Sequence, residues 1–256
     1  MSLNAGPPIV SMGALGVLGL GLVYGLKHAT EVDHIVAVSA IVSEHRKLWR
    51  AAVVGGLWGV GHTASLVIVG AVVLALRIAI PLRVAGWLEF GVALMIIGLG
   101  MAALRRALRS RADFHLHRHA HGNLRHAHVH FHEHESEYAD LLSHSHTVGR
   151  VGLKPLIVGA VHGLAGSGAL TLLVLTQIDS PILGLLYLSV FGIGSIIGML
   201  LMSGLMGIPF ALSTRKLTGI HYVLQMAAGV LSVAFGIWYA YETGIASGLM
   251  KSLTAV

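Results

Sequence analysis

The chain has no cysteine among its 256 residues, and charged residues make up only 11% of it. Without thiols it forms no disulfide and offers no thiolate metal site or cysteine nucleophile. The Gly-x-x-x-x-Gly-Lys loop that cradles phosphates is also absent, so we expect that this chain does not itself use ATP. The first 26 residues lack Lys and Arg, and the first apolar run is therefore predicted to be a retained helix rather than a cleaved signal peptide.

The chain is rich in apolar residues: 55% of the residues are hydrophobic, and the mean hydropathy is +0.79. Several runs exceed the roughly 20 apolar residues that cross a bilayer as a helix, and they are too long for the strands of a membrane barrel. We therefore predict an all-α integral membrane protein surrounded by a lipid bilayer. The six predicted transmembrane helices span 10–43, 51–76, 84–104, 153–177, 182–210 and 218–241.

The remaining charge is positive, with a net charge of +6, and it lies in short segments between the apolar runs. Membrane proteins carry their topogenic Lys and Arg residues in such segments, so we expect no nucleic-acid partner. The basic segments 44–50, 105–150 and 211–217 follow alternate helices. The positive-inside bias then predicts that all three segments are cytoplasmic and that both termini lie outside.

One stretch of the first apolar run is unusually polar. His28, Glu31, Asp33 and His34 lie within seven residues, and ionisable groups at membrane depth persist mainly where they pair, face a cavity or bind something. Imidazole with carboxylate is ligand chemistry for a divalent first-row transition metal. Because His28 and His34 are six residues apart, they fall on different faces of a regular helix. We therefore predict that this long helix is broken at the motif, as helices around midplane transporter sites are.

Two further histidines lie in apolar runs and are candidates for the same site. His62 stands in a glycine-rich part of the second predicted helix, and His162 stands in the fourth. The alternatives are a packed, hydrogen-bonded histidine at either position and, for the motif itself, a structural hydrogen-bond network or a proton relay. Glu31 has its own alternative, which is to orient an imidazole rather than bind the ion.

The two ends of the chain resemble each other, which predicts two inverted repeats of three helices, 1–104 and 151–256, joined by 105–150. In this alignment His28 falls opposite His162, and His62 falls opposite Ser195 in a shared glycine-rich pattern. The second repeat therefore lacks most of the candidate ligands. We predict one asymmetric site, built mainly on the first repeat, with His162 as the contribution of the second.

The linking segment 105–150 is polar and rich in histidine, and we predict a disordered cytoplasmic loop there. Neutral imidazoles at this density bind Ni²⁺, Co²⁺, Cu²⁺ or Zn²⁺. We expect a metal buffer or sensor that is dispensable for passage through the membrane. It holds 11 of the 17 histidines, namely His115, His117, His119, His121, His126, His128, His130, His132, His134, His144 and His146.

At the motif the chain resembles the nickel/cobalt transporter (NiCoT) family. The family signature His-Ala-x-Asp-Ala-Asp-His-Ile is similar to the sequence of residues 28–35, which differs by Glu31 and Val32, and residues 61–65 resemble the next family motif, Leu-Gly-His-Ser. The family's later acidic motif, Asp-Thr-Ala-Thr-Glu, is missing. The length of the chain is similar to that of the shorter six-helix branch associated with urease gene clusters.

The resemblance implies a secondary permease in a bacterial-type inner membrane, not an enzyme. It implies that Ni²⁺, with Co²⁺ as a second cargo, is the transported substrate rather than a cofactor, and that uptake is the direction. His28, Asp33, His34 and His62 carry over as nickel-handling residues. It also implies cytoplasmic nickel chaperones or urease and hydrogenase maturation proteins as recipients.

Two other functions stay open at this point. An exporter of the same metals would equally suit a histidine-rich cytoplasmic segment. An intramembrane metalloenzyme is disfavoured, because a zinc protease needs His-Glu-x-x-His on a helix, and the nearest match, at 132–135, has the wrong spacing and lies in a polar segment.

Overall fold

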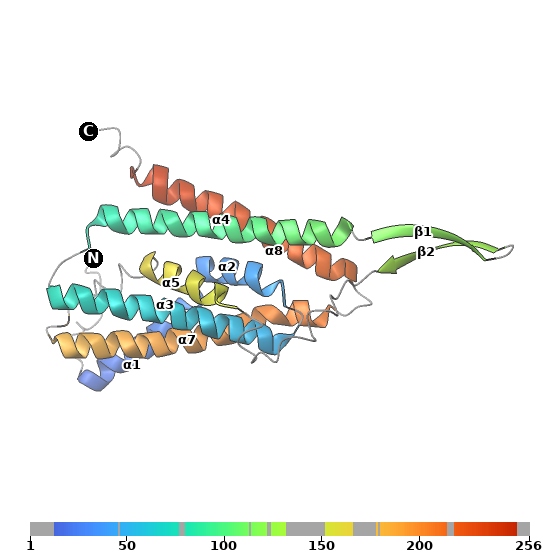
Figure 1. Ribbon diagram of the computed structural model, residues 1–256. Coiled ribbons are helices and arrows are strands. Elements are labelled where there is room, and N and C mark those ends of the chain that lie inside the picture. Colours follow the sequence, from blue (N-terminus) through green and yellow to red (C-terminus); the bar gives the residue numbers. More distant parts are fainter. Residues whose placement is uncertain are drawn as a thin grey trace, which may run out of the picture.

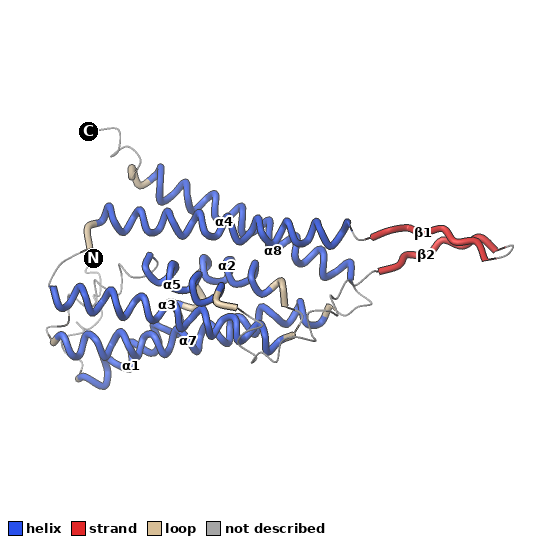
Figure 2. The backbone as a smooth tube through the Cα atoms, viewed as in Figure 1, coloured by secondary structure: helices blue, strands red, loops and turns tan. Residues whose placement is uncertain are grey.

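The computed structural model describes residues 13–45, 47–76, 80–112, 114–121, 124–131, 152–165, 178, 180–213 and 218–249. The described residues form seven α-helices and one β-hairpin (Figures 1 and 2). The elements are α1 (Ala14–His28), α2 (Val32–Val42), α3 (Leu48–Leu76), α4 (Leu82–Ala112), β1 (Phe114–His121), β2 (Leu124–Phe131), α5 (Lys154–Ala165), α7 (Pro181–Leu212) and α8 (Thr218–Tyr241), with a π-helical turn at Glu242–Ala246.

The helices are those of a multi-pass membrane protein, which confirms the predicted class. Four stretches are long and apolar enough to cross a bilayer, namely Leu48–Leu76, Arg83–Arg109, Pro181–Leu212 and Gly219–Ala246. Large apolar side chains on these helices, such as Ile68, Leu201 and Leu231, are more than half exposed. Exposed apolar surface on this scale is costly in water and is what a helix presents to lipid.

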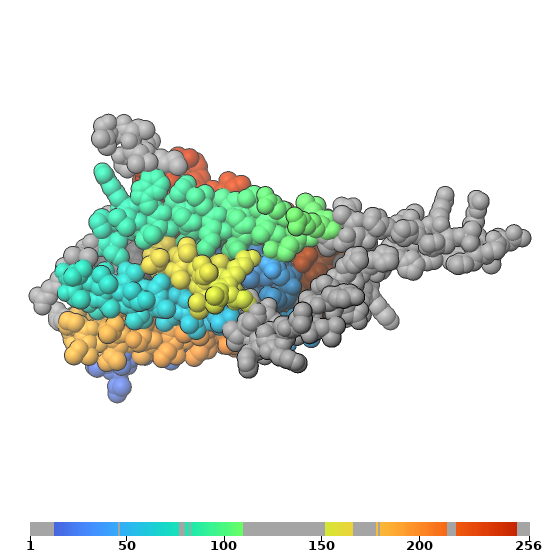
Figure 3. Space-filling model, viewed as in Figure 1, coloured from blue at the N-terminus to red at the C-terminus, as the bar shows by residue number. Residues whose placement is uncertain are grey.

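The helices lie in two layers with short helices between them (Figure 1). On one side α4 packs along α8, and on the other α3 packs along α7, with α1 on the outer face of α7. The short helices α2 and α5 lie between these layers, where α2 contacts α4, α7 and α8, and α5 contacts α3 and α4. In the space-filling view α5 fills the space between α3 and α4 (Figure 3).

The first predicted helix is broken at the motif, as the sequence predicts. Helix α1 ends at His28, and α2 begins at Val32 after an extended residue, Glu31, with ψ of 147°. The turn between them is held by the Thr30 hydroxyl and backbone N–H, which both donate to the Lys27 carbonyl, at 2.6 and 2.9 Å. The break separates the two segments, so that α1 packs on α7 while α2 lies between the layers.

Glycines let the helices of the transmembrane core approach backbone to backbone. A Cβ added to Gly25 in α1 would overlap the Phe191 carbonyl of α7, and one added to Gly159 in α5 would overlap the Trp58 carbonyl of α3. Close approach of this kind is a common use of small residues in membrane helices. The same relation holds between Gly61 and the Leu156 carbonyl, and between Gly194 and the Leu22 carbonyl.

The structure corrects two of the predicted boundaries, and two further predicted segments lie outside the described residues. Helix α4 runs to Ala112 rather than ending at 104, and residues 114–121 and 124–131 pair as antiparallel strands where the sequence predicts a disordered loop. Alternating residues along 114–131 permit strand pairing, which a composition-based argument overlooks. Of the fourth predicted helix, α5 accounts for the described part, and 166–177 lies outside it, as does 132–150.

A cluster of ion pairs lies at one end of the bundle. Glu44, after α2, accepts from Arg106 Nη2 of α4 at 2.7 Å and from Lys154 Nζ of α5 at 3.4 Å. Partial burial lowers the pKa of the neighbouring His45, so this imidazole adds no charge to the cluster at neutral pH. The Gln225 amide of α8 donates to the Ser43 carbonyl at 2.8 Å. The ends of four elements therefore meet here.

We expect Glu44→Gln to lower thermal stability only slightly. The three side chains of the cluster are 28–48% exposed, and exposed ion pairs contribute about 0–1 kcal/mol each. Melting followed by helical circular dichroism in detergent should show a small decrease at low salt. The decrease should vanish near 1 M salt, where the Debye length is about 3 Å. Glu242→Gln, at the opposite end of α8, is the matched control, and an equal decrease there would contradict this role of Glu44.

Candidate metal centre

Four histidines from four helices meet in the middle of the bundle. His28 ends α1, and His34, His62 and His162 lie in α2, α3 and α5; none is more than 2% exposed. The ring centroids of His28 and His34 are 4.3 Å apart, those of His34 and His162 4.0 Å, and those of His28 and His62 4.9 Å. Because His62 stands halfway along α3, which is long enough to span a bilayer, the cluster lies near mid-span.

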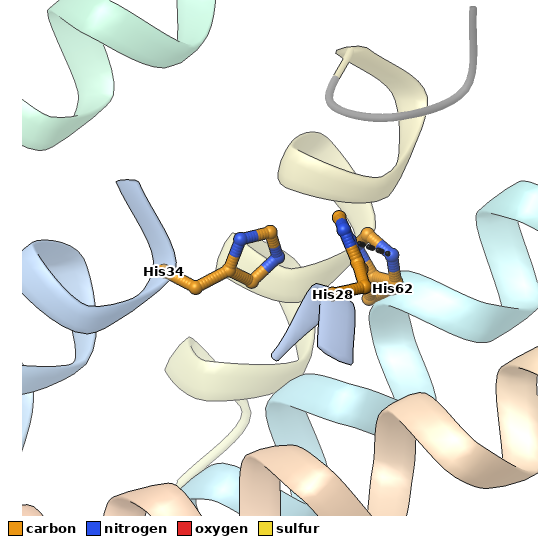
Figure 4. A group of neighbouring side chains, drawn as sticks. All are labelled: His28, His34 and His62. Carbon is orange, nitrogen blue, oxygen red and sulfur yellow. Dashed lines mark hydrogen bonds between the residues drawn. The ribbon is translucent and has the colours of Figure 1, made fainter. Parts of the chain in front are cut away.

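His28 and His62 face each other through the same ring nitrogen (Figure 4). Their Nε2 atoms are 3.2 Å apart, and His28 Nδ1 lies 2.9 Å from the Glu31 carboxylate. A carboxylate accepts, so a neutral His28 carries its ring proton on Nδ1 and keeps the lone pair of Nε2. The proton between the two rings then belongs to His62. For a divalent ion to bind both Nε2 atoms, that proton would have to move to Nδ1 of His62, the other ring nitrogen.

Asp33 holds the other two imidazoles. Its Oδ1 accepts from the backbone N–H and Nδ1 of His34, at 2.9 and 3.0 Å, and its Oδ2 accepts from His162 Nε2 at 2.8 Å. The ring protons of both histidines are thereby assigned, which leaves lone pairs on His34 Nε2 and His162 Nδ1. A carboxylate that fixes the tautomer and orientation of an imidazole is a usual companion of metal-binding histidines.

The remaining ring nitrogens of three of these histidines have no hydrogen-bond partner in the described part of the chain. His34 Nε2, His162 Nδ1 and His62 Nδ1 are buried and make no hydrogen bond to any described residue. A buried, unpaired polar atom costs about 1–3 kcal/mol, and three of them in one place indicate a site built for a ligand. Two overlapping groups have ligand atoms within 4.8 Å of one another, namely His28, His34 and His62, and Asp33, His34 and His162.

All six residues that the sequence singles out lie in this cluster. His28, His34, His62 and His162 supply the imidazoles, Asp33 bridges two of them, and Glu31 lies at the edge with its side chain 46% exposed. The position of Glu31 fits the alternative reading in which it orients His28. The chemistry of the donor set, imidazole nitrogen with carboxylate, suits Ni²⁺, Co²⁺, Zn²⁺ or Cu²⁺.

Two aromatic walls of the site were missed by the sequence reasoning. Trp58 is fully buried, with its ring centroid 5.6 Å from that of His162 and 6.1 Å from that of His34. Phe191 lies 5.5 Å from His28 in the same measure. The signal for Trp58 was present, since it precedes His62 by four residues and therefore shares its helix face.

The chain is similar in sequence to a known protein. It is 38% identical over 244 residues to the urease accessory protein UreH of Bacillus sp. (strain TB-90), and the alignment covers 93% of this chain and 96% of the relative. The chain belongs to the UreH family of urease accessory proteins. The UreH family is the urease-associated branch of the NiCoT family, so the resemblance at residues 28–35 is confirmed. No family model and no solved structure matches this UreH-family chain.

Proposed function

We propose that this UreH-family protein is a secondary permease that carries Ni²⁺, with Co²⁺ as a second cargo, into the cytoplasm. The observation that supports it best is the buried cluster of four imidazoles and Asp33 at the break between α1 and α2. A set of this kind is costly at membrane depth unless it binds something. The relative is named as an accessory to urease, and we assign this protein no catalytic residue.

In this proposal His28, His34 and His62 bind the ion, and Asp33 and Glu31 orient them. Because His34 belongs to both candidate groups, the ion can move toward Asp33 and His162 while it keeps one protein ligand. Movement between overlapping sites avoids a fully unliganded ion in the membrane, and it keeps each site weak enough to release its cargo. Imidazole binds a metal only through a deprotonated ring nitrogen, and in the tautomers assigned above each ring of the cluster keeps one such nitrogen.

We further propose that the transmembrane helices are two inverted repeats. The glycine contacts support this, because they come in reciprocal pairs. In the repeat alignment Gly25 corresponds to Gly159, and Phe191 corresponds to Trp58; Gly25 meets the Phe191 carbonyl, and Gly159 meets the Trp58 carbonyl. An axis that exchanges the halves would produce such pairs. The contacts of Gly61 with Leu156 and of Gly194 with Leu22 form a second reciprocal pair in the same alignment.

We place the end of the bundle that carries Glu44, Arg106 and Lys154 in the cytoplasm of a bacterial-type inner membrane. Basic residues cluster there, and the positive-inside bias favours that side. Release at this end would supply Ni²⁺ to cytoplasmic nickel chaperones or to urease or hydrogenase maturation proteins. Efflux is the second candidate, because the histidine-rich hairpin extends from the same end (Figure 1) and suits capture of an outgoing ion.

The test is accumulation of radioactive nickel in cells that express the intact protein, His34→Ala, His45→Ala or a deletion of 112–148. We expect His34→Ala to fall to the level of the empty vector, because it removes the residue that both candidate groups share. His45→Ala, a histidine outside the cluster, and the deletion should retain uptake. Accumulation below the vector level would mean export. A His34→Ala variant that accumulates as much nickel as the intact protein would refute the site.

A further inference from the structure

Helices α2 and α5 are joined by a polar contact at each end. Asp33, near the start of α2, accepts from His162 Nε2 near the end of α5 at 2.8 Å. Glu44, just after α2, accepts from Nζ of Lys154, the first residue of α5, at 3.4 Å. The two helices are therefore antiparallel. From Asp33 to Glu44 a helix rises about 16 Å, close to half of the roughly 30 Å hydrocarbon core, so the two contacts connect the mid-span site with the end of the bundle.

The helix faces between these two contacts are apolar. Ala37 and Ala40 share the face of α2 that carries Asp33, because helix positions four and seven residues apart lie on one face. On α5, Val158 lies four residues from each of the two residues that contact α2, and so shares their face. All three apolar side chains are buried and belong to one core cluster. We call these two faces, with the contacts at their ends, the α2–α5 seam.

Each helix of the seam is tied to a different neighbour on another side. Helix α2 is tied to α8, since the Gln225 amide donates to the Ser43 carbonyl at 2.8 Å and the Ser232 hydroxyl donates to the Val36 carbonyl at 3.0 Å. Helix α5 is tied to α3 by the close backbone contact at Gly159. None of these ties crosses the seam, so α2 and α5 can part while all of them stay intact.

We propose that the α2–α5 seam is the path between the metal centre and the cytoplasmic end, and that the Glu44–Lys154 ion pair is its gate. The inference rests on the proposed function. While the pair is closed, the Lys154 ammonium group stands at the end of the seam and repels a divalent cation. The pair is partly exposed, so it contributes little stability and opens easily. Parting of the helices would also separate Asp33 from His162 and let the ion leave that group of ligands.

The experiment links the two sides of the gate covalently. The chain contains no cysteine, so an introduced pair of thiols can be joined selectively with a short, reducible bis-methanethiosulfonate linker. Glu44→Cys with Lys154→Cys places the linker across the seam. Glu44→Cys with Arg106→Cys is the matched control, because Glu44 also accepts from Arg106 of α4, at 2.7 Å, and this linker does not cross the seam. The measurement is downhill Ni²⁺ flux into proteoliposomes, with each variant compared before linking, after linking and after reduction.

We expect the linker across the seam to reduce the flux to that of protein-free liposomes, and reduction of the linker to restore it. The linker in the control variant should leave the flux in place, because α2 and α4 stay together when the seam opens. Flux that persists with the seam linked would overturn the proposal. Equal loss of flux in the two linked variants would also overturn it, because the block would then not be specific to the seam.

A second measurement reports opening without transport. A thiol at Val158→Cys is buried in the closed seam and reacts slowly with a water-soluble maleimide, because the reactive thiolate forms poorly in apolar surroundings. With Lys154→Gln added, we expect labelling to be about two- to fivefold faster, since the loss of one partly exposed ion pair shifts an equilibrium by about this factor. Val92→Cys is the matched control, because Val92 is equally apolar, 1% exposed and lies on α4; its labelling should not change.

Labelling of Val158→Cys that is unchanged by Lys154→Gln, or that rises equally at both cysteine positions, would overturn the gate. Because labelling does not depend on transport, failure of the gate and failure of the permease proposal give different results. Absence of Ni²⁺ flux through the intact protein would refute the permease, and the labelling rates would still decide whether the seam opens when the ion pair is removed.

Discussion

We expect Asp33→Asn to reduce nickel accumulation by about 10- to 100-fold, the usual cost of losing a partner that orients metal-binding histidines. Asp33 accepts from the rings of His34 and His162 at once. An asparagine has only one oxygen to accept, so its NH₂ group would face one of the two ring N–H groups. One imidazole must then change tautomer or turn away, and the lone pair that it offers to the ion moves with it.

The measurement is the initial rate of radioactive nickel uptake, normalised to the amount of protein in the membrane. Glu31→Gln is the matched comparison, since Glu31 also accepts from a cluster imidazole but has a side chain 46% exposed, against 14% for Asp33. Water can replace much of what Glu31 provides, and we expect a several-fold smaller loss there. Uptake in Asp33→Asn equal to that of the intact protein would contradict the assigned tautomers.

The second large effect is on folding, and we expect Gly25→Ala to reduce the yield and the melting temperature of the protein. The added methyl would overlap the Phe191 carbonyl and lie against the Ser195 backbone N–H. Relief requires α1 to move away from α7. Forcing a methyl into a filled contact costs about 1–3 kcal/mol. Because the overlapped atoms are backbone, we expect the upper part of that range, which exceeds the roughly 1 kcal/mol that alanine gains over glycine in a helix.

Gly19→Ala is the matched control, because Gly19 lies in the same helix with open space where its Cβ would be. That variant should be as stable as the intact protein or more stable. Gly159→Ala should reproduce the loss seen for Gly25→Ala, since its methyl would meet the Trp58 carbonyl in the reciprocal contact. The measurement is melting of the helical signal in detergent. Equal stability of Gly25→Ala and Gly19→Ala would show that the crossing is looser than described.

The parts of this site that sequence reasoning could reach are those with a simple physical signature. Ionisable groups inside an apolar run are conspicuous, so His28, Glu31, Asp33 and His34 could be found. The break was predictable because six residues do not return to the same helix face. The sequence made His62 and His162 candidates for the site but could not place them in it, because their position depends on how helices far apart in the sequence pack.

What the sequence could not supply was pairing between groups. The hydrogen bond between Asp33 and His162 depends on the angle between α2 and α5, and no spacing rule contains that angle. Trp58 looks like any other apolar residue of a membrane helix. The hairpin was missed for a related reason, because histidine-rich composition indicates metal affinity and says nothing about which strand residues face each other.

The glycine crossings also determine which parts of the protein can move. Each joins α1 to α7 or α5 to α3 through the backbone, and α3 packs along α7, so these four helices form one body. Gly100 and Gly229 join α4 to α8 in the same close way, which makes a second body. Each body draws helices from both proposed repeats, so we expect the moving units to differ from the three-helix repeats. We expect alternating access to be a displacement of the α4–α8 pair, with Ala29–Glu31 as the link between α1 on one body and α2, which packs on the other. The ion would then be held at a joint, where a small displacement changes its ligands.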